Sequence, residues 1–166
     1  MPGESEKTES RENEVLTWEI TGGASRVLVS LGNSVLTEFT LGNGRRADIA
    51  GINRQGRITI VEVKSSLSDF RSDGKWPEYL DYCDLFYFAV GPGFPLRVLD
   101  EEASFPEKTG IIVADRFDGD VLRPAPYRKM APARRRSETL RFARSAADRL
   151  GLSSDSLALT TPRRRA

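Results

Sequence analysis

Apolar residues recur at helical spacing in two stretches of the chain, one near each end. The first stretch, residues 16–31, predicts a helix that stops at Gly32. Gly22 and Gly23 argue against this helix, because each lowers helix stability by roughly 1 kcal/mol. The second stretch, residues 137–150, predicts a helix with Ser137 as its N-cap. We expect the apolar side of this second helix to pack on the core. That side carries Leu140, Ala143, Ala147 and Leu150.

Between these helices the apolar residues alternate or form short continuous runs, which is typical of β-strands. The strand candidates are residues 34–41, 46–53, 57–64, 85–90, 110–114 and 121–122. A short turn at residues 54–56 joins the second and third candidates into a hairpin. Residues 67–83 predict a loop or short turn, followed by a helix that begins near Trp76 with Pro77 in its first turn.

The order of elements is therefore a helix, three strands, a helix and a strand, followed by a strand pair and a final helix. Apolar runs flanked by helices indicate an α/β sandwich in a single domain. We expect residues 14–123 to form the core, and residues 124–150 to form a basic linker and a helix packed on it. Residues 1–13 are expected to be disordered, and residues 151–166 to be a flexible basic tail.

The composition excludes several kinds of catalysis. The sequence has no histidine, which removes Ser-His-Asp and Cys-His nucleophile systems and His-ligated zinc chemistry. Any catalysis must then use carboxylates, Lys, Tyr or a metal held by oxygen ligands. Cys83 is the single cysteine and forms no internal disulfide, so a reducing cytoplasm is the expected setting. No run approaches the length of a membrane span, and the acidic start is not a signal peptide, so we expect no membrane partner.

Charge is distributed very unevenly along the chain. From Arg123 onward there are twelve basic and three acidic residues, a net charge of +9, whereas residues 1–122 carry a net charge of −8. This polarity suggests that the C-terminal part meets an anion, with nucleic acid as the leading candidate. Arg134, Arg135 and Arg136 are the main candidates for a clamp on the phosphate backbone; the alternative is a solvated surface.

The hairpin at residues 46–64 carries the candidate chemistry. Alternation places Glu62 and Lys64 side by side at the end of the second strand, and the turn places Asp48 opposite Glu62. Two opposed carboxylates repel each other, but a divalent cation turns that repulsion into a binding site. Oxygen ligands favour Mg²⁺ or Mn²⁺, and the backbone carbonyl of Val63 would be a further ligand. Lys64 beside the metal would orient or activate a water and stabilise negative charge. The plain alternative is a structural Glu–Lys ion pair with a turn-capping Asp.

Other polar residues near this hairpin have a functional and a structural interpretation. Glu38, on the preceding strand, is either an extra metal ligand or a surface residue. Ser65 either ends the strand or touches phosphate. Trp76 would stack on a base or pack in the core, of which core packing is favoured. Arg45 and Arg46 would neutralise phosphate or pair with local acids. Arg71 and Lys75 are candidates for contact with DNA.

This arrangement resembles the PD-(D/E)xK nuclease superfamily, with Asp48 on one strand, Glu62-Val63-Lys64 on the next, and Ala47 in place of the often degenerate proline. From about Leu31 to Leu150 the chain is similar to the MmcB-type family of bacterial DNA repair proteins, which belongs to that superfamily. The segments GRRAD, VEVKSS, DFRSDGKWPEYLDYCD, FYFAV and APARRR carry this resemblance. It implies a restriction endonuclease-like αβββαβ core, with a mixed central sheet flanked by helices, and a role in DNA damage tolerance.

Together these patterns predict a metal-dependent DNA endonuclease that acts in repair, in the bacterial cytoplasm at the nucleoid. Asp48 and Glu62 would bind Mg²⁺ or Mn²⁺, and Lys64 would assist the attacking water. The expected substrate is branched, damaged or single-stranded DNA, since nothing in the sequence resembles a module that reads base sequence. A DNA-binding adaptor that cuts nothing, and a nuclease that acts on RNA, remain alternatives. Repair proteins are possible partners, and a homodimer is suggested by analogy alone.

Overall fold

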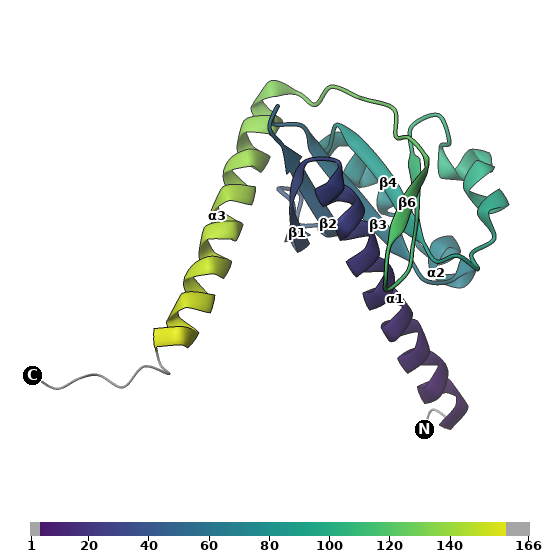
Figure 1. Ribbon diagram of the computed structural model, residues 1–166. Coiled ribbons are helices and arrows are strands. Elements are labelled where there is room, and N and C mark those ends of the chain that lie inside the picture. Colours follow the sequence, from purple (N-terminus) through teal and green to yellow (C-terminus); the bar gives the residue numbers. More distant parts are fainter. Residues whose placement is uncertain (1–3, 159–166) are drawn as a thin grey trace, which may run out of the picture.

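The computed structural model describes residues 4–158 (Figure 1). Its helices and strands are, in chain order, α1 (Glu4–Ser30), β1 (Asn33–Thr40), β2 (Arg46–Asn53), β3 (Ile58–Lys64), α2 (Leu67–Ser72), the 3₁₀ helix η1 (Trp76–Tyr82), β4 (Leu85–Val90), the 3₁₀ helices η2 (Leu96–Asp100) and η3 (Glu102–Ser104), β5 (Gly110–Ala114), β6 (Gly119–Arg123) and α3 (Pro132–Ala158). The strand predictions are confirmed to within two residues. The region predicted as a loop or turn before Trp76 instead contains the short helix α2, which Ser66 caps by accepting a hydrogen bond from the Asp69 N–H.

All six strands form one mixed sheet in the order β1-β2-β3-β4-β5-β6. The strand pairs β1–β2, β2–β3 and β5–β6 are antiparallel, whereas β3, β4 and β5 run parallel. The parallel strands need crossover connections, which α2, η1, η2 and η3 supply. The predicted α/β class, a mixed sheet flanked by helices, is confirmed.

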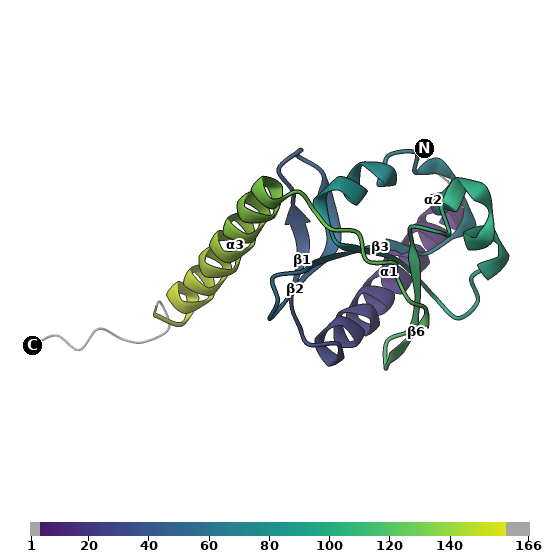
Figure 2. The same ribbon diagram turned by 90° about the horizontal axis from the view of Figure 1, so that it is seen from above.

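Helices lie on both faces of the sheet (Figure 2), and each face carries its own hydrophobic core. On one face α1 packs Ile20, Ala24, Val27 and Leu28 against residues that include Ile49, Val61 and Val63. On the other face the helices between β3 and β4 supply Phe70, Trp76 and Tyr79, which pack on two phenylalanines of β4, Phe86 and Phe88. Every residue of β3 is consequently buried, including two charged residues at its end.

The first helix begins earlier than the sequence suggested. Residues 4–13, predicted to be disordered, continue α1 toward the N-terminus, and Figure 1 shows this part extending beyond the sheet. The prediction relied on the absence of large apolar groups. Glu, Lys, Arg and Ser are nevertheless compatible with helix, and a helix already anchored on the sheet propagates without a new nucleation cost. Residues 1–3 lie outside the described residues.

The last helix also differs from its prediction, both in length and in the face that it buries. It begins at Pro132, not at Ser137, and it includes residues 151–158 of the predicted flexible tail; the rest of that tail is outside the described residues. The predicted apolar side is exposed at all four of its residues, and Phe142 packs instead on Phe39 with ring centroids 5.5 Å apart. The helix touches the core mainly through its first turns and then projects away from the sheet in both views (Figures 1 and 2).

The strand β1 reverses its side-chain alternation at Glu38. This residue has a positive φ of 51°, which residues other than glycine rarely adopt. Before it, Val35 packs on the α1 side of the sheet, whereas after it Phe39 and Leu41 pack in the other core. The kink brings the β1–β2 connection against α3, where the Gly42 N–H donates a hydrogen bond to Glu138 Oε1 at 3.1 Å. Among residues 4–158, no helix has the length and apolar character that a membrane span requires.

Candidate active site

The hairpin β2–β3 places two carboxylates opposite each other. Ile49 pairs with Val61, so the next positions outward along the two strands are Asp48 and Glu62, as the sequence predicted. The paired residues of the two strands end at Ile49 and Val61. Beyond them, the Asp48 side chain accepts a hydrogen bond from the Val63 N–H at 2.8 Å. This bond fixes the Asp48 carboxylate at the end of the sheet, beside the Glu62 side chain.

Glu62 is held in an environment that disfavours its negative charge. Its residue is 8% exposed, and its Oε2 atom is buried without a hydrogen-bond partner among the described residues. Burial, together with the nearby Asp48 charge, raises the pKa of Glu62 to about 8. Burial also raises the pKa of Asp48, although the Val63 N–H and Lys64 act in the opposite direction. A site with two such carboxyls favours a bound cation.

Lys64 lies next to Glu62 and is anchored by an acid that the sequence analysis did not select. Its Nζ atom is 3.6 Å from Glu62 Oε1 and 2.6 Å from Asp73 Oδ2. Asp73 is fixed in turn by the Lys75 N–H, which donates to its Oδ1 at 3.0 Å. Burial lowers the pKa of Lys64, but the bond to Asp73 and the Glu62 charge more than offset it, so its pKa stays above the usual value. Lys64 is therefore a fixed ammonium group and a hydrogen-bond donor.

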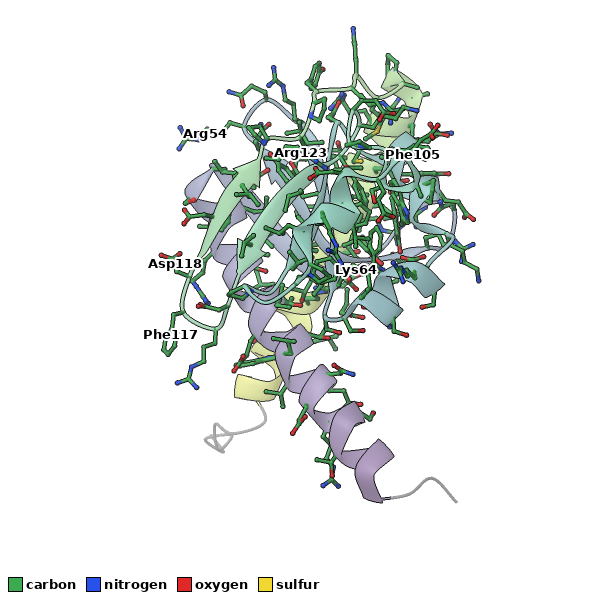
Figure 3. All side chains as sticks on the ribbon, turned by 90° about the vertical axis from the view of Figure 1, so that its right-hand side faces the viewer. Arg54, Lys64, Phe105, Phe117, Asp118 and Arg123 are labelled. Carbon is green, nitrogen blue, oxygen red and sulfur yellow. The ribbon has the colours of Figure 1, made fainter. Side chains whose placement is uncertain are left out.

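These groups lie at the base of a cleft of about 1050 Å³ between α1 and the end of the hairpin. One wall is a face of α1, and the other residues that line the cleft are Thr37, Glu38, Asp48, Glu62, Val63, Lys64, Ser65 and Asp69. Figure 3 shows Lys64 at the end of the sheet from which the N-terminal part of α1 projects, with Arg54 of the hairpin turn at the opposite end. The cleft is large enough to admit a substrate to both carboxylates.

The donors present fit a divalent cation bound by two carboxylates. Within residues 4–158 no three acidic or cysteine side chains gather closely enough to hold a metal ion by themselves. Mg²⁺ usually keeps several waters and takes only one or two carboxylates, which matches Asp48, Glu62 and the free Oε2 atom. Glu38 lines the cleft, but its carboxylate pairs with Arg46 at 2.7 Å, so the structure favours its reading as a surface residue. The Val63 N–H donates to Asp48, and the role of the Val63 carbonyl as a metal ligand stays a prediction.

The predicted nucleic-acid contacts close to the cleft differ in their surroundings. Arg45 forms two hydrogen bonds with Glu78, at 2.7 and 2.9 Å, which is the local pairing that the sequence left open. Ser65 lines the cleft, and its N–H points to Asp69 Oδ2 at 3.4 Å. Arg71 and Lys75 are exposed just beyond the site. Trp76 is packed on Phe86 and Phe88, in agreement with the favoured core reading.

The three arginines predicted as a backbone clamp have separate roles. Arg135 forms an ion pair with the fully buried carboxylate of Asp84 and donates to the Gly56 carbonyl, so it fixes α3 to the closed end of the hairpin, away from the acids. Arg135 thus has a structural role as an ion pair, and its contact with DNA stays a prediction. Arg134 stacks on Tyr82 and donates to a backbone carbonyl of η1, whereas Arg136 is exposed. A continuous clamp at the cleft is not formed by these residues.

Two contributions to the site were missed by sequence reasoning. Asp73 follows Lys64 by nine residues, and only the compact turn of α2 returns it to the ammonium group. The wall formed by α1 was missed because its residues lie far from the hairpin in sequence and partly in the segment that was expected to be disordered. The spacing of acids after Glu62-Val63-Lys64 was the one signal that could have suggested Asp73 or Asp69.

Comparison with known proteins places the chain among DNA repair proteins. The sequence model of a family described as DNA repair protein MmcB-like matches residues 4–156. A solved structure described as SPO1766, a protein of unknown function from Silicibacter pomeroyi, is 34% identical and superposes with a TM-score of 0.77, covering 90% of this chain and 97% of its own. A repair endonuclease from Pyrococcus abyssi shows 14% identity and a TM-score of 0.36, over 55% of this chain and 42% of its own. No curated protein matches the chain.

Proposed function

The chain belongs to the MmcB-like DNA repair protein family, and on that premise we propose that it is a metal-dependent nuclease that hydrolyses phosphodiester bonds in DNA. Family membership supports the role in DNA repair, and the hydrolytic step rests on the site. The observation that carries it is the pair of opposed carboxylates, Asp48 and Glu62, with a buried ammonium group beside them and an unpartnered oxygen on Glu62.

A bound Mg²⁺ or Mn²⁺ would neutralise the two carboxylates and act as a Lewis acid toward a phosphodiester oxygen. Asp48 and Glu62 are the residues that would hold it. Lys64 keeps its proton, so it serves as an electrostatic and hydrogen-bonding group toward negative charge on the phosphate, and not as a general base. Asp73 positions the ammonium group through the 2.6 Å bond and limits its freedom to turn away.

The proposal is tested by incubating the protein with end-labelled DNA and either Mg²⁺, Mn²⁺ or a chelator. The substrates are single-stranded, flapped, nicked, duplex and four-way junction DNA. Asp48→Asn, Glu62→Gln and Lys64→Met are each expected to lower the cleavage rate by about 10²–10³-fold, the range for removing one preorganised electrostatic group. Glu38→Gln is the matched control, because it neutralises an acid at the rim of the same cleft that is already paired with an arginine.

Two results would count against this function. Cleavage that continues at the wild-type rate in Lys64→Met or Asp48→Asn would assign the activity to other residues or to a contaminant. Binding of DNA without turnover of any substrate, together with no heat of Mn²⁺ binding by calorimetry, would favour the non-cutting adaptor. Faster cleavage of RNA than of DNA would change the substrate class.

A further inference from the structure

The wall of α1 that faces the acids is polar, and Glu14 is its one charged residue. Asn13, Thr17, Thr21 and Ser25 line the cleft and recur every four residues, so they lie one above another along α1. Trp18 lines the same cleft beside them. The wall therefore combines small hydrogen-bonding groups with one large aromatic ring, opposite the carboxylates of the hairpin.

Trp18 is unusually accessible for a tryptophan. It is 76% exposed, whereas Trp76, the other tryptophan of the chain, is 4% exposed and packed among phenylalanines. Leaving an indole in water forgoes the stabilisation that burial would give a large apolar group. An exposed indole in a cleft is suited to stacking on a flat ligand that enters from solvent.

The charges of the cleft argue against binding by a basic clamp. Among the residues that line it, Lys64 is the single base, and it is already paired with Asp73. The acids that line it are Glu14, Glu38, Asp48, Glu62 and Asp69. Affinity for a nucleic acid in this cleft must come from stacking and hydrogen bonds to bases, with a cation between the acids and the phosphate.

The hydroxyl groups of the wall define which part of a nucleotide faces it. The Thr17 hydroxyl donates to the Asn13 carbonyl and the Thr21 hydroxyl donates to the Thr17 carbonyl, each at 2.8 Å. With their hydrogens committed, these oxygens can only accept. Phosphate oxygens also only accept, whereas base edges carry N–H donors. At Thr17 and Thr21 the wall therefore matches a base edge better than a phosphate, whereas Ser25 Oγ, which is buried without a partner among the described residues, can still donate.

We propose that the cleft takes unpaired DNA nucleotides, with Trp18 stacked on a base and the base edge facing the α1 hydroxyls; the position of the scissile phosphate beside Asp48 and Glu62 rests on the proposed function. Bases in a duplex have their edges and faces occupied by pairing and stacking. A volume of about 1050 Å³ is just above the range for small-ligand pockets, roughly 300–1,000 Å³, and suits a few nucleotides better than a double helix.

Fluorescence tests this directly, because Trp18 is exposed and Trp76 is buried. Thymidine 12-mers, single-stranded or annealed to an adenosine strand, are added in Mg²⁺ to Lys64→Met, which is expected to cut DNA about 10²–10³-fold more slowly than the wild type. Single strands are expected to quench the Trp18 emission, and the duplex to quench it much less. Trp18→Ala is expected to weaken single-strand binding, measured by anisotropy, about 5- to 150-fold. Phe117→Ala is the matched control, since this aromatic residue is 72% exposed on the β5–β6 hairpin (Figure 3). The affinity of this variant for the single strand should differ from that of the wild type by less than twofold.

The outcomes separate this inference from the proposed nuclease activity. Quenching by single strands without cleavage by the wild type keeps the stacking site and removes the nuclease. Cleavage that requires Lys64 but is unaffected by Trp18→Ala, or that prefers duplex DNA, removes the stacking site and keeps the nuclease. Absence of quenching by any oligonucleotide, or tighter binding of a uridine 12-mer than of the thymidine 12-mer, overturns the inference. Circular dichroism of Trp18→Ala distinguishes lost binding from lost folding.

Discussion

In the absence of a divalent cation, Glu62→Gln is expected to make the protein more stable than the wild type at pH 8. Burial and the neighbouring Asp48 raise the pKa of Glu62 from its ordinary 4.5 to about 8. The folded protein therefore keeps the Glu62 proton up to about pH 8, whereas the unfolded chain releases it near pH 4.5. Because the folded state binds more protons between these values, the stability of the wild type falls as the pH rises through them.

The size of this effect follows from the pKa. At about 1.4 kcal/mol per pH unit, the contribution of Glu62 lowers the unfolding free energy by roughly 1 kcal/mol at pH 5 and roughly 4 kcal/mol at pH 8, relative to strongly acidic solution. Glutamine has the same shape and no charge, so the variant lacks this dependence. The stability difference between Glu62→Gln and the wild type should thus widen by about 3 kcal/mol from pH 5 to pH 8.

Urea denaturation in EDTA, followed by tryptophan fluorescence at several pH values, measures this difference. Glu38→Gln is the control, because the exposed Glu38 side chain should contribute less than about 0.5 kcal/mol at every pH. A difference between Glu62→Gln and wild type that stays constant with pH would refute the reasoning. So would a wild type that gains stability over the variant as the pH rises.

Three further predictions concern the cation, the close approach of α1 to the sheet, and the buried ion pair. Mg²⁺ at a hundredfold excess over its dissociation constant should stabilise the wild type by about 2.7 kcal/mol in a thermal melt, and Asp48→Asn much less. Gly23→Ala should lower the unfolding free energy by at least about 2 kcal/mol in urea denaturation, because its Cβ would lie 2.3 Å from a carbonyl oxygen of the β5–β6 hairpin. Gly22→Ala is the control: the nearest atom to its Cβ would be 3.5 Å away, so this variant should stabilise α1 by roughly 0.5–1 kcal/mol. Arg135→Met should cost about 3–5 kcal/mol because it leaves the Asp84 charge buried, and adding Asp84→Asn should recover part of that loss; no recovery would show that the charge is not the cause.

The sheet and the two opposed acids could be predicted because they depend on local pattern. The strands at residues 46–53, 85–90 and 110–114 match their predicted limits, since apolar alternation and buried runs mark them directly. Counting outward from the hairpin turn was enough to place Asp48 opposite Glu62. The placement of the two acids could therefore be predicted because a single hairpin determines it.

The rest depends on contacts between segments distant in sequence. Hydrophobicity alone assigned Leu140 to the buried side of α3, but the contact of Phe142 with Phe39 and the ion pair of Arg135 orient the helix differently. The ion pair of Arg135 could not be predicted because a sequence does not show that Asp84 lies beneath the basic run. For the same reason the wall of α1 could not be assigned to the cleft.

The kink at Glu38 also affects how this protein can meet other copies of itself. β1 lies at an edge of the sheet, where a regular strand would offer a row of free amides and carbonyls to any neighbouring strand. The positive φ interrupts that row, and Arg149 of α3 occupies the Glu38 carbonyl with a 3.0 Å hydrogen bond. The bend at Glu38 therefore makes the β1 edge a poor partner for a strand of another copy, and this disfavours polymerisation through added strands.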